Sequence, residues 1–165
     1  MMMSAKNLNS FFIILAFSSC ILAKQKMIGQ SDLYVFIWHI YDIELYSQGE
    51  FSFNKPFKLV LHYKRSLTGE EITKHSTEQM QEIHCSNAKQ AKEWDQRMHT
   101  IFPDIESGDT LTGSYQPNGP TLFYKNDKLI GRVDDPAFGR CFFGIWLDPK
   151  TTEPELRKEL LGETS

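Results

Sequence analysis

Apolar and polar side chains alternate along two segments near the start of the chain, a pattern typical of half-buried β-strands. Residues 33–46 are rich in aromatic and β-branched side chains and alternate in their second half. They predict one long strand, or two strands joined by a bend, nearly buried at first and half-exposed later. Residues 57–63 carry a large apolar side chain at every second position and follow a turn sequence at residues 54–56, which predicts another strand.

The period then changes to that of a helix. Residues 69–84 have a helical composition, and Thr68 followed by Glu71 forms the sequence of a capping box at their start. Apolar side chains recur at helical spacing across residues 87–101, and Pro103 follows that segment. The sequence therefore predicts two consecutive helices after the first strands.

Strand-like segments return at residues 110–115, 121–125 and 128–132. Only Asn126 and Asp127 separate the last two, and such short connections favour antiparallel neighbours. This part of the chain predicts an antiparallel meander.

Two further helices are expected at the end. Asp135 and Pro136 are a good helix start, and the segment that follows, up to residue 147, is so apolar that the helix should be buried. Thr152 is expected to cap a short last helix that ends at Gly162. Strands, two helices, strands and two helices predict an α+β domain, with an antiparallel sheet and helices on one of its faces.

Composition fits this picture for residues 24–165 and sets residues 1–23 apart. The chain is 41% hydrophobic and 24% charged, as expected for one globular domain. Lys6, the apolar run after it and the small residues before position 24 predict a secretory signal peptide over residues 1–23, cleaved after Ala23. Lipid attachment at Cys20 is the alternative. We therefore expect an exported, periplasmic protein that meets the membrane only through its signal peptide or such an anchor.

Charge and motifs exclude several classes of function. The net charge is −3, so nucleic acid is not an expected partner. The five histidines show no metal-ligand spacing, and phosphate-loop and dinucleotide motifs are absent, so neither a metal nor a cofactor is predicted. Cys85 and Cys141 are expected to be free or buried thiols; an oxidising compartment would permit a bridge, but the sequence cannot show that they meet.

Four segments in a fixed order carry a family resemblance. They are Tyr34-Val-Phe ahead of IYDIELY at residues 40–46, LHYKR at residues 61–65, FPDIESGDTL at residues 102–111, and FFGIWL at residues 142–147 followed by the leucine-rich terminal helix. Together they resemble the bacterial chalcone isomerase-like family of exported proteins. The resemblance implies an open-faced β-sandwich, in which a large antiparallel sheet is backed by a layer of helices with an apolar cleft between them.

The catalytic groups of plant chalcone isomerases are mostly missing from the matching positions. The strand hydroxyl falls on Phe36, the catalytic tyrosine on Ile72 and the catalytic asparagine on Gln79, while residues 29–33 hold no arginine. Only an amide remains. Because the reaction needs donors that stabilise negative charge on the substrate carbonyl, this favours a protein without catalytic residues.

The resemblance implies instead that a fatty acid or a similar small amphiphile binds in the cleft. Trp38, Tyr41 and Tyr63 are the predicted lining residues, Arg65 the predicted partner of a carboxylate, and Gln79 the surviving amide. A solvated Arg65 and ordinary core aromatics remain open alternatives for these positions. Two other functions also remain open: an isomerase (intramolecular lyase) with a rebuilt site, and an envelope interaction protein with a filled core.

Overall fold

The computed structural model describes residues 24–163. The predicted signal peptide, its cleavage after Ala23 and the alternative lipid site at Cys20 therefore lie outside the described residues, or at their boundary. The strands are β1 (Lys26–Val35), β2 (Trp38–Ser47), β3 (Phe57–Tyr63), β4 (Thr110–Tyr115), β5 (Thr121–Lys125) and β6 (Lys128–Val133); the helices are α1 (Gly69–Glu82), α2 (Ala88–Ile101), α3 (Pro136–Leu147) and α4 (Pro154–Leu160).

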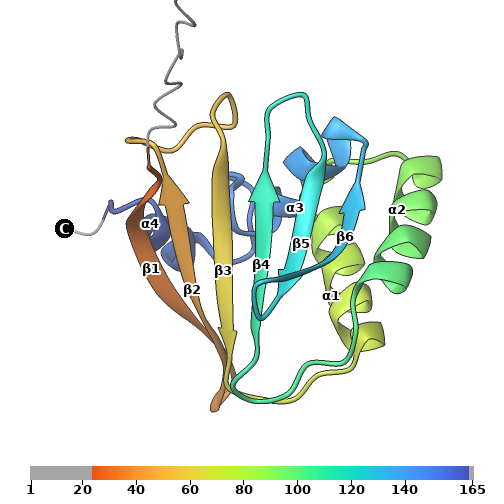
Figure 1. The fold of residues 1–165 in the computed structure, drawn as a ribbon, viewed down its shortest axis with the longest axis horizontal. Coiled ribbons are helices and arrows are strands. Elements are labelled where there is room, and N and C mark those ends of the chain that lie inside the picture. The colour runs from red at the N-terminus through yellow and green to blue at the C-terminus, as the bar shows by residue number, and fades with distance from the viewer. Residues whose placement is uncertain (1–23, 164–165) are drawn as a thin grey trace, which may run out of the picture.

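The six strands form one antiparallel sheet in chain order, with β1 and β6 at its edges. Helices α1, α3 and α4 lie across one face, and α2 packs beside α1 at the β6 edge (Figure 1). The alternation in β2 and β3 turns one set of side chains, such as Ile43 and Leu59, into the core and leaves the other face of the sheet open. The expected α+β fold, a large antiparallel sheet backed by helices, is confirmed.

Most helix starts lie where the capping residues predicted them. Thr68 and Glu71 form the expected capping box, and the Asp135 carboxylate accepts from the backbone N–H of Ala137. The predicted cap at Thr152 is wrong, because α4 begins at Pro154 and the Thr152 hydroxyl donates instead to Oε1 of Gln79, at 2.6 Å. Proline at the first helical position sets this start without a side-chain cap.

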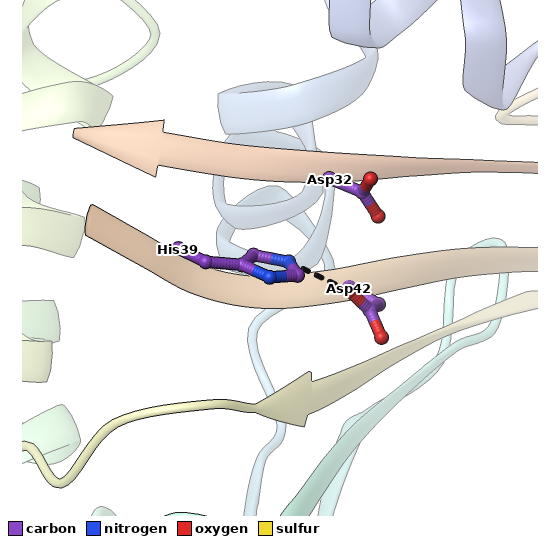
Figure 2. Close-up of side chains that lie close together, drawn as sticks. All are labelled: Asp32, His39 and Asp42. Carbon is purple, nitrogen blue, oxygen red and sulfur yellow. Dashed lines mark ion pairs between the residues drawn. The ribbon is translucent and has the colours of Figure 1, made fainter. Parts of the chain in front are cut away.

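The first predicted strand segment, residues 33–46, holds the end of β1, a turn and most of β2, so the alternative of two strands joined by a bend is confirmed, and β1 begins earlier, at Lys26. Val35 pairs with Trp38, so Phe36 and Ile37 form the turn between β1 and β2. Near the turn, Asp32 on β1 lies beside His39 and Asp42 on β2 (Figure 2). The expectation that this first half is nearly buried is wrong: 96% of Phe36 and 82% of Ile37 is exposed.

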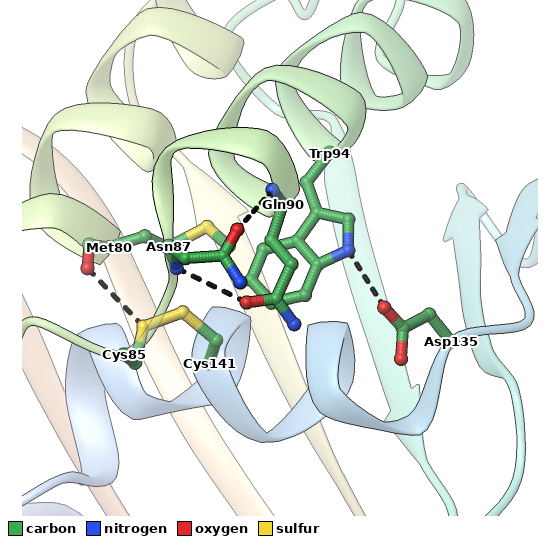
Figure 3. Close-up of a disulfide and its surroundings, with 7 residues drawn as sticks. All are labelled: Met80, Cys85, Asn87, Gln90, Trp94, Asp135 and Cys141. Atoms are coloured by element: carbon green, nitrogen blue, oxygen red, sulfur yellow. Dashed lines mark hydrogen bonds between the residues drawn. A yellow bond between two sulfur atoms is a disulfide. The ribbon is translucent and has the colours of Figure 1, made fainter.

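A disulfide joins the helical layer (Figure 3). Cys85, in the connection between α1 and α2, bonds to Cys141 in α3, and their Cα atoms are 5.5 Å apart. The expectation of free thiols is therefore wrong. The two cysteines are 56 residues apart in sequence, and they meet because the α1–α2 turn packs over α3. Among residues 24–163, no helix is long and apolar enough to cross a membrane.

Candidate functional site

A cavity of about 490 Å³ lies between the sheet and the helices. Its volume is in the range of pockets that hold small molecules. Its walls are mainly aliphatic and aromatic, with Leu59, Leu61, Leu111, Phe123, Phe142, Phe143 and Ile145 among them. The core is therefore not filled, which argues against an interaction protein with a filled core.

All five predicted binding residues line this cavity. Trp38 and Tyr41 come from β2, Tyr63 from the end of β3, Arg65 from the segment after β3, and Gln79 from α1. Strands β2 and β3 pair Tyr41 with Tyr63, which places residues from two separate sequence segments side by side. Their contact with a ligand stays a prediction.

Two buried phenols are among the polar groups that line the cavity. The rings of Tyr41 and Tyr63 meet edge to face with centroids 5.5 Å apart. Burial raises the pKa of both phenols far above neutral. Trp146 Nε1 donates to Tyr41 Oη at 2.9 Å, which leaves the Tyr41 proton available to an acceptor in the cavity. These groups can donate hydrogen bonds to a ligand, but they are not poised to act as bases.

Arg65 supplies a cation on the cavity wall. Its guanidinium lies over the Trp38 ring, 4.0 Å from the centroid, and the residue is half-buried. None of the ion pairs found among residues 24–163 involves Arg65. A guanidinium held against an aromatic ring, with its charge unpaired, is suited to bind a carboxylate.

A further polar group, the Gln79 amide, lines the cavity where α1 meets the segment before α4. Gln79 Oε1 accepts from the Thr152 hydroxyl, so the amide nitrogen remains free to donate. Ser76 also lines the cavity, but its hydroxyl already donates to the backbone carbonyl of Ile72. The donors available in the cavity therefore include the phenols, the guanidinium and this amide, beside the exposed His75 ring.

The positions that match plant catalytic residues lie in different environments. Ile72 and Gln79 line the cavity, whereas Phe36 is at the exposed hairpin turn and does not. An apolar side chain thus occupies the position of the catalytic tyrosine, and the strand hydroxyl has no counterpart in the cavity at the position where the sequence match places it.

Sequence reasoning missed the contribution of α3. Phe142, Phe143, Ile145 and Trp146 were expected only as a buried helix, but they form a wall of the cavity. The sequence signal was the wide apolar surface of this helix. That pattern is the same whether the side chains pack against the sheet or line a cavity.

Asp32, His39 and Asp42 are the only group of three residues within 24–163 that could hold a metal ion (Figure 2). One potential ligand atom from each residue lies within 4.8 Å of the other two. His39 Nε2 lies 2.7 Å from one oxygen of Asp42, and Lys64 Nζ lies 2.5 Å from the other. Partial burial would raise the pKa of Asp42, but the Lys64 hydrogen bond and charge outweigh it and lower that pKa. Because the lysine already neutralises the central carboxylate and Asp32 is exposed, the group is better described as an ion-pair network.

Comparison with known proteins agrees with this architecture. A fatty-acid binding protein of Arabidopsis thaliana has a crystal structure that superposes with a TM-score of 0.68 at 10% identity, covering 89% of this chain and 91% of that one. A protein of Haemophilus influenzae strain Rd, described as uncharacterized, is 27% identical over 161 residues, which are 95% of this chain and 79% of that protein. Residues 34–162 match the sequence profile of the family described as chalcone isomerase-like. This protein therefore belongs to the chalcone isomerase-like family.

Proposed function

We propose that this protein binds a fatty acid or a similar small amphiphile in the cavity between sheet and helices, without catalysis. The observation that carries the proposal is a cavity of about 490 Å³ with apolar walls and an unpaired guanidinium among its lining groups. The name of the Arabidopsis thaliana protein of the same fold agrees with this proposal.

The walls supply enough driving force for such a ligand. Burying one methylene group contributes about 0.8 kcal/mol, so about ten methylenes would contribute roughly 8 kcal/mol before the costs of association. Arg65 is the expected partner of the carboxylate, and Trp38 holds its guanidinium in place. The donors at Tyr41 and Gln79 offer further positions for a polar head group.

The same geometry supports a binding function without catalysis. The phenols have pKa values raised away from neutral, and an apolar side chain stands where the plant enzymes have their tyrosine. We expect no cyclisation of a chalcone substrate above the uncatalysed rate. Turnover that disappears in Tyr41→Phe would instead support the isomerase and overturn the proposal.

We further propose that the protein is exported to the periplasm. Residues 1–23 have the composition of a signal peptide, and the Cys85–Cys141 disulfide is of the kind that persists in oxidising compartments. A mature N-terminus at residue 24, read by mass spectrometry of protein from a periplasmic extract, would support this proposal.

Native mass spectrometry of protein purified without detergent tests the binding function. We expect an additional mass that chemical analysis identifies as a fatty acid or related lipid. Leu61→Trp fills the cavity from β3 and should abolish the adduct, whereas Leu122→Trp, on the opposite face of the sheet, should retain it. Protein that stays ligand-free after incubation with fatty acids of several lengths would refute the proposal.

A further inference from the structure

The hairpin turn between β1 and β2 presents an unusual surface. Residues 34–38, here called the tip, are Tyr34, Val35, Phe36, Ile37 and Trp38. They make up five of the seven large apolar residues that are exposed within residues 24–163. Exposed apolar side chains scattered singly need no explanation, but five consecutive ones on a single turn do.

Local backbone preference does not explain the tip. Phe36 has φ of 56°, a left-handed conformation that hairpin turns usually assign to glycine or asparagine. The sequence thus places its most exposed aromatic residue where a small or polar residue would be more stable. Such a departure from local rules is typical of a site whose residues serve binding.

The tip is continuous with the cavity. Val35 and Trp38 belong to the tip and also line the cavity, as does Arg65, whose guanidinium lies over the Trp38 ring. The hairpin extends past the neighbouring strand, because β2 starts at Trp38 while its pairing with β3 begins at Tyr41. A ligand at the tip therefore has an apolar path inward.

We propose that the tip docks onto the surface of a phospholipid bilayer, so that an amphiphile passes between the bilayer and the cavity along an apolar path. The transfer of an amphiphile rests on the proposed function. Docking of the tip to the bilayer does not depend on that function. Aromatic residues with apolar and amphipathic rings, beside an arginine, are the composition that membrane interfaces favour.

A bilayer fits the tip better than a protein partner does. Stable protein interfaces bury about 800 Å² on each side, and a single protruding turn offers a narrow contact instead of a broad face. The charges at the base of the hairpin are balanced, since Asp32 and Asp42 oppose Lys64 and Arg65. We therefore expect the apolar side chains of the tip to insert into the bilayer only as deep as the head-group region, because the backbone polar groups of the turn must stay in contact with water.

Vesicle binding tests this inference, in a Cys20→Ala background so that no lipid attached there carries the protein to the membrane. The protein should co-sediment with phosphatidylcholine vesicles. The double variant Phe36→Ser with Ile37→Ser should bind these vesicles about tenfold more weakly, or weaker still. Leu129→Ser removes an exposed apolar residue from the β6 edge strand and should bind as the parent does. Since 52% of Trp38 is exposed while Trp94 and Trp146 are buried, phospholipids brominated near the head group should quench its fluorescence.

Two results would overturn the inference. One is vesicle binding that is absent or unchanged in the double variant. The other is a dimer that becomes monomeric in the double variant, because the tip would then be covered by a second copy. The cavity-filled Leu61→Trp protein separates this inference from the proposed function: it should still bind vesicles although it holds no ligand.

Discussion

At the scale of single residues, the cavity combines a few charged groups, Arg65 and the exposed Glu153 among them, with many apolar contacts. Arg65 is half-buried and stacked on Trp38, so part of the cost of ordering its long side chain is already met before a ligand arrives. Tyr41 and Tyr63 stay neutral and cannot compete with a carboxylate for the guanidinium. The arrangement favours an acidic head group near Arg65 and a hydrocarbon chain deeper inside.

Arg65→Gln should weaken binding of a saturated fatty acid roughly tenfold, because a charge-assisted hydrogen bond contributes about 1.5 kcal/mol. Affinity for the fatty alcohol of equal length should hardly change. Titration calorimetry with both ligands measures the difference. Arg140→Gln is the matched control, since Arg140 lies over the Phe53 ring in the same manner but outside the cavity. Equal loss for acid and alcohol would show that Arg65 acts only through packing.

Asp109 links the loop before β4 to the β5–β6 turn. The side-chain amide of Asn126, the backbone N–H of Glu106 and the Lys125 ammonium all contact its carboxylate, and they lower the pKa of Asp109 to about 2. A carboxyl group with a pKa depressed in the folded state stabilises the fold above its unfolded pKa, near 4, and loses that contribution as the pH falls through 2.

Asp109→Asn should therefore lower the free energy of unfolding at neutral pH, and its difference from the parent should shrink as the pH falls from about 5 to about 2. Urea denaturation at a series of pH values measures both curves. Asp127→Asn removes a carboxylate from the neighbouring turn that makes no hydrogen bond or ion pair within residues 24–163, and it serves as control. A deficit for Asp109→Asn that stays constant over this range would contradict the assigned role of the carboxylate.

At the scale of elements, the sequence predicted what local chemistry determines. Thr68 with Glu71, and Asp135 with Pro136, mark helix starts because they satisfy backbone N–H groups within one turn of chain. The sequence left open a bend within residues 33–46 but could not place it, because Phe36 and Ile37 carry no turn signal. Thr152 failed as a cap because its hydroxyl bonds to Gln79, a partner distant in sequence.

The disulfide shows the same limit, since no local pattern could pair Cys85 with Cys141. It ties the α1–α2 connection to α3, which carries one wall of the cavity. Replacing both residues, Cys85→Ser with Cys141→Ala, should lower the free energy of unfolding by about 2–4 kcal/mol, because the cross-link restricts the unfolded chain. Guanidinium titration measures this loss. The parent protein in reductant should unfold like the double variant; if reductant leaves the parent unchanged, the two cysteines are not bonded in solution.

At the scale of the whole molecule, the family resemblance predicted the layers, and the five residues named from the sequence line one cavity. The resemblance also implied the cleft between those layers, but the residue pattern alone could not, because the apolar residues of α3 would look the same if they packed tightly against the sheet. Whether side chains meet or leave a void depends on the distance between layers, which no periodicity encodes. The apolar tip was likewise predicted to be a nearly buried strand. Rules derived from folding place such residues in the core, whereas in the proposed role they are exposed for binding.

A void of this size should make the stability of the whole domain depend on its ligand. A ligand that binds only the folded state, at a hundred times its dissociation constant, adds about 2.7 kcal/mol. For a chain of this length this corresponds to a rise in melting temperature of roughly 5–10 °C. Differential scanning calorimetry with a fatty acid added to delipidated protein should show this rise, and also show it for Leu122→Trp. Leu61→Trp should melt at one temperature with or without the fatty acid, since its indole occupies the space the hydrocarbon chain would fill. A shift of equal size in Leu61→Trp would place the ligand outside the cavity.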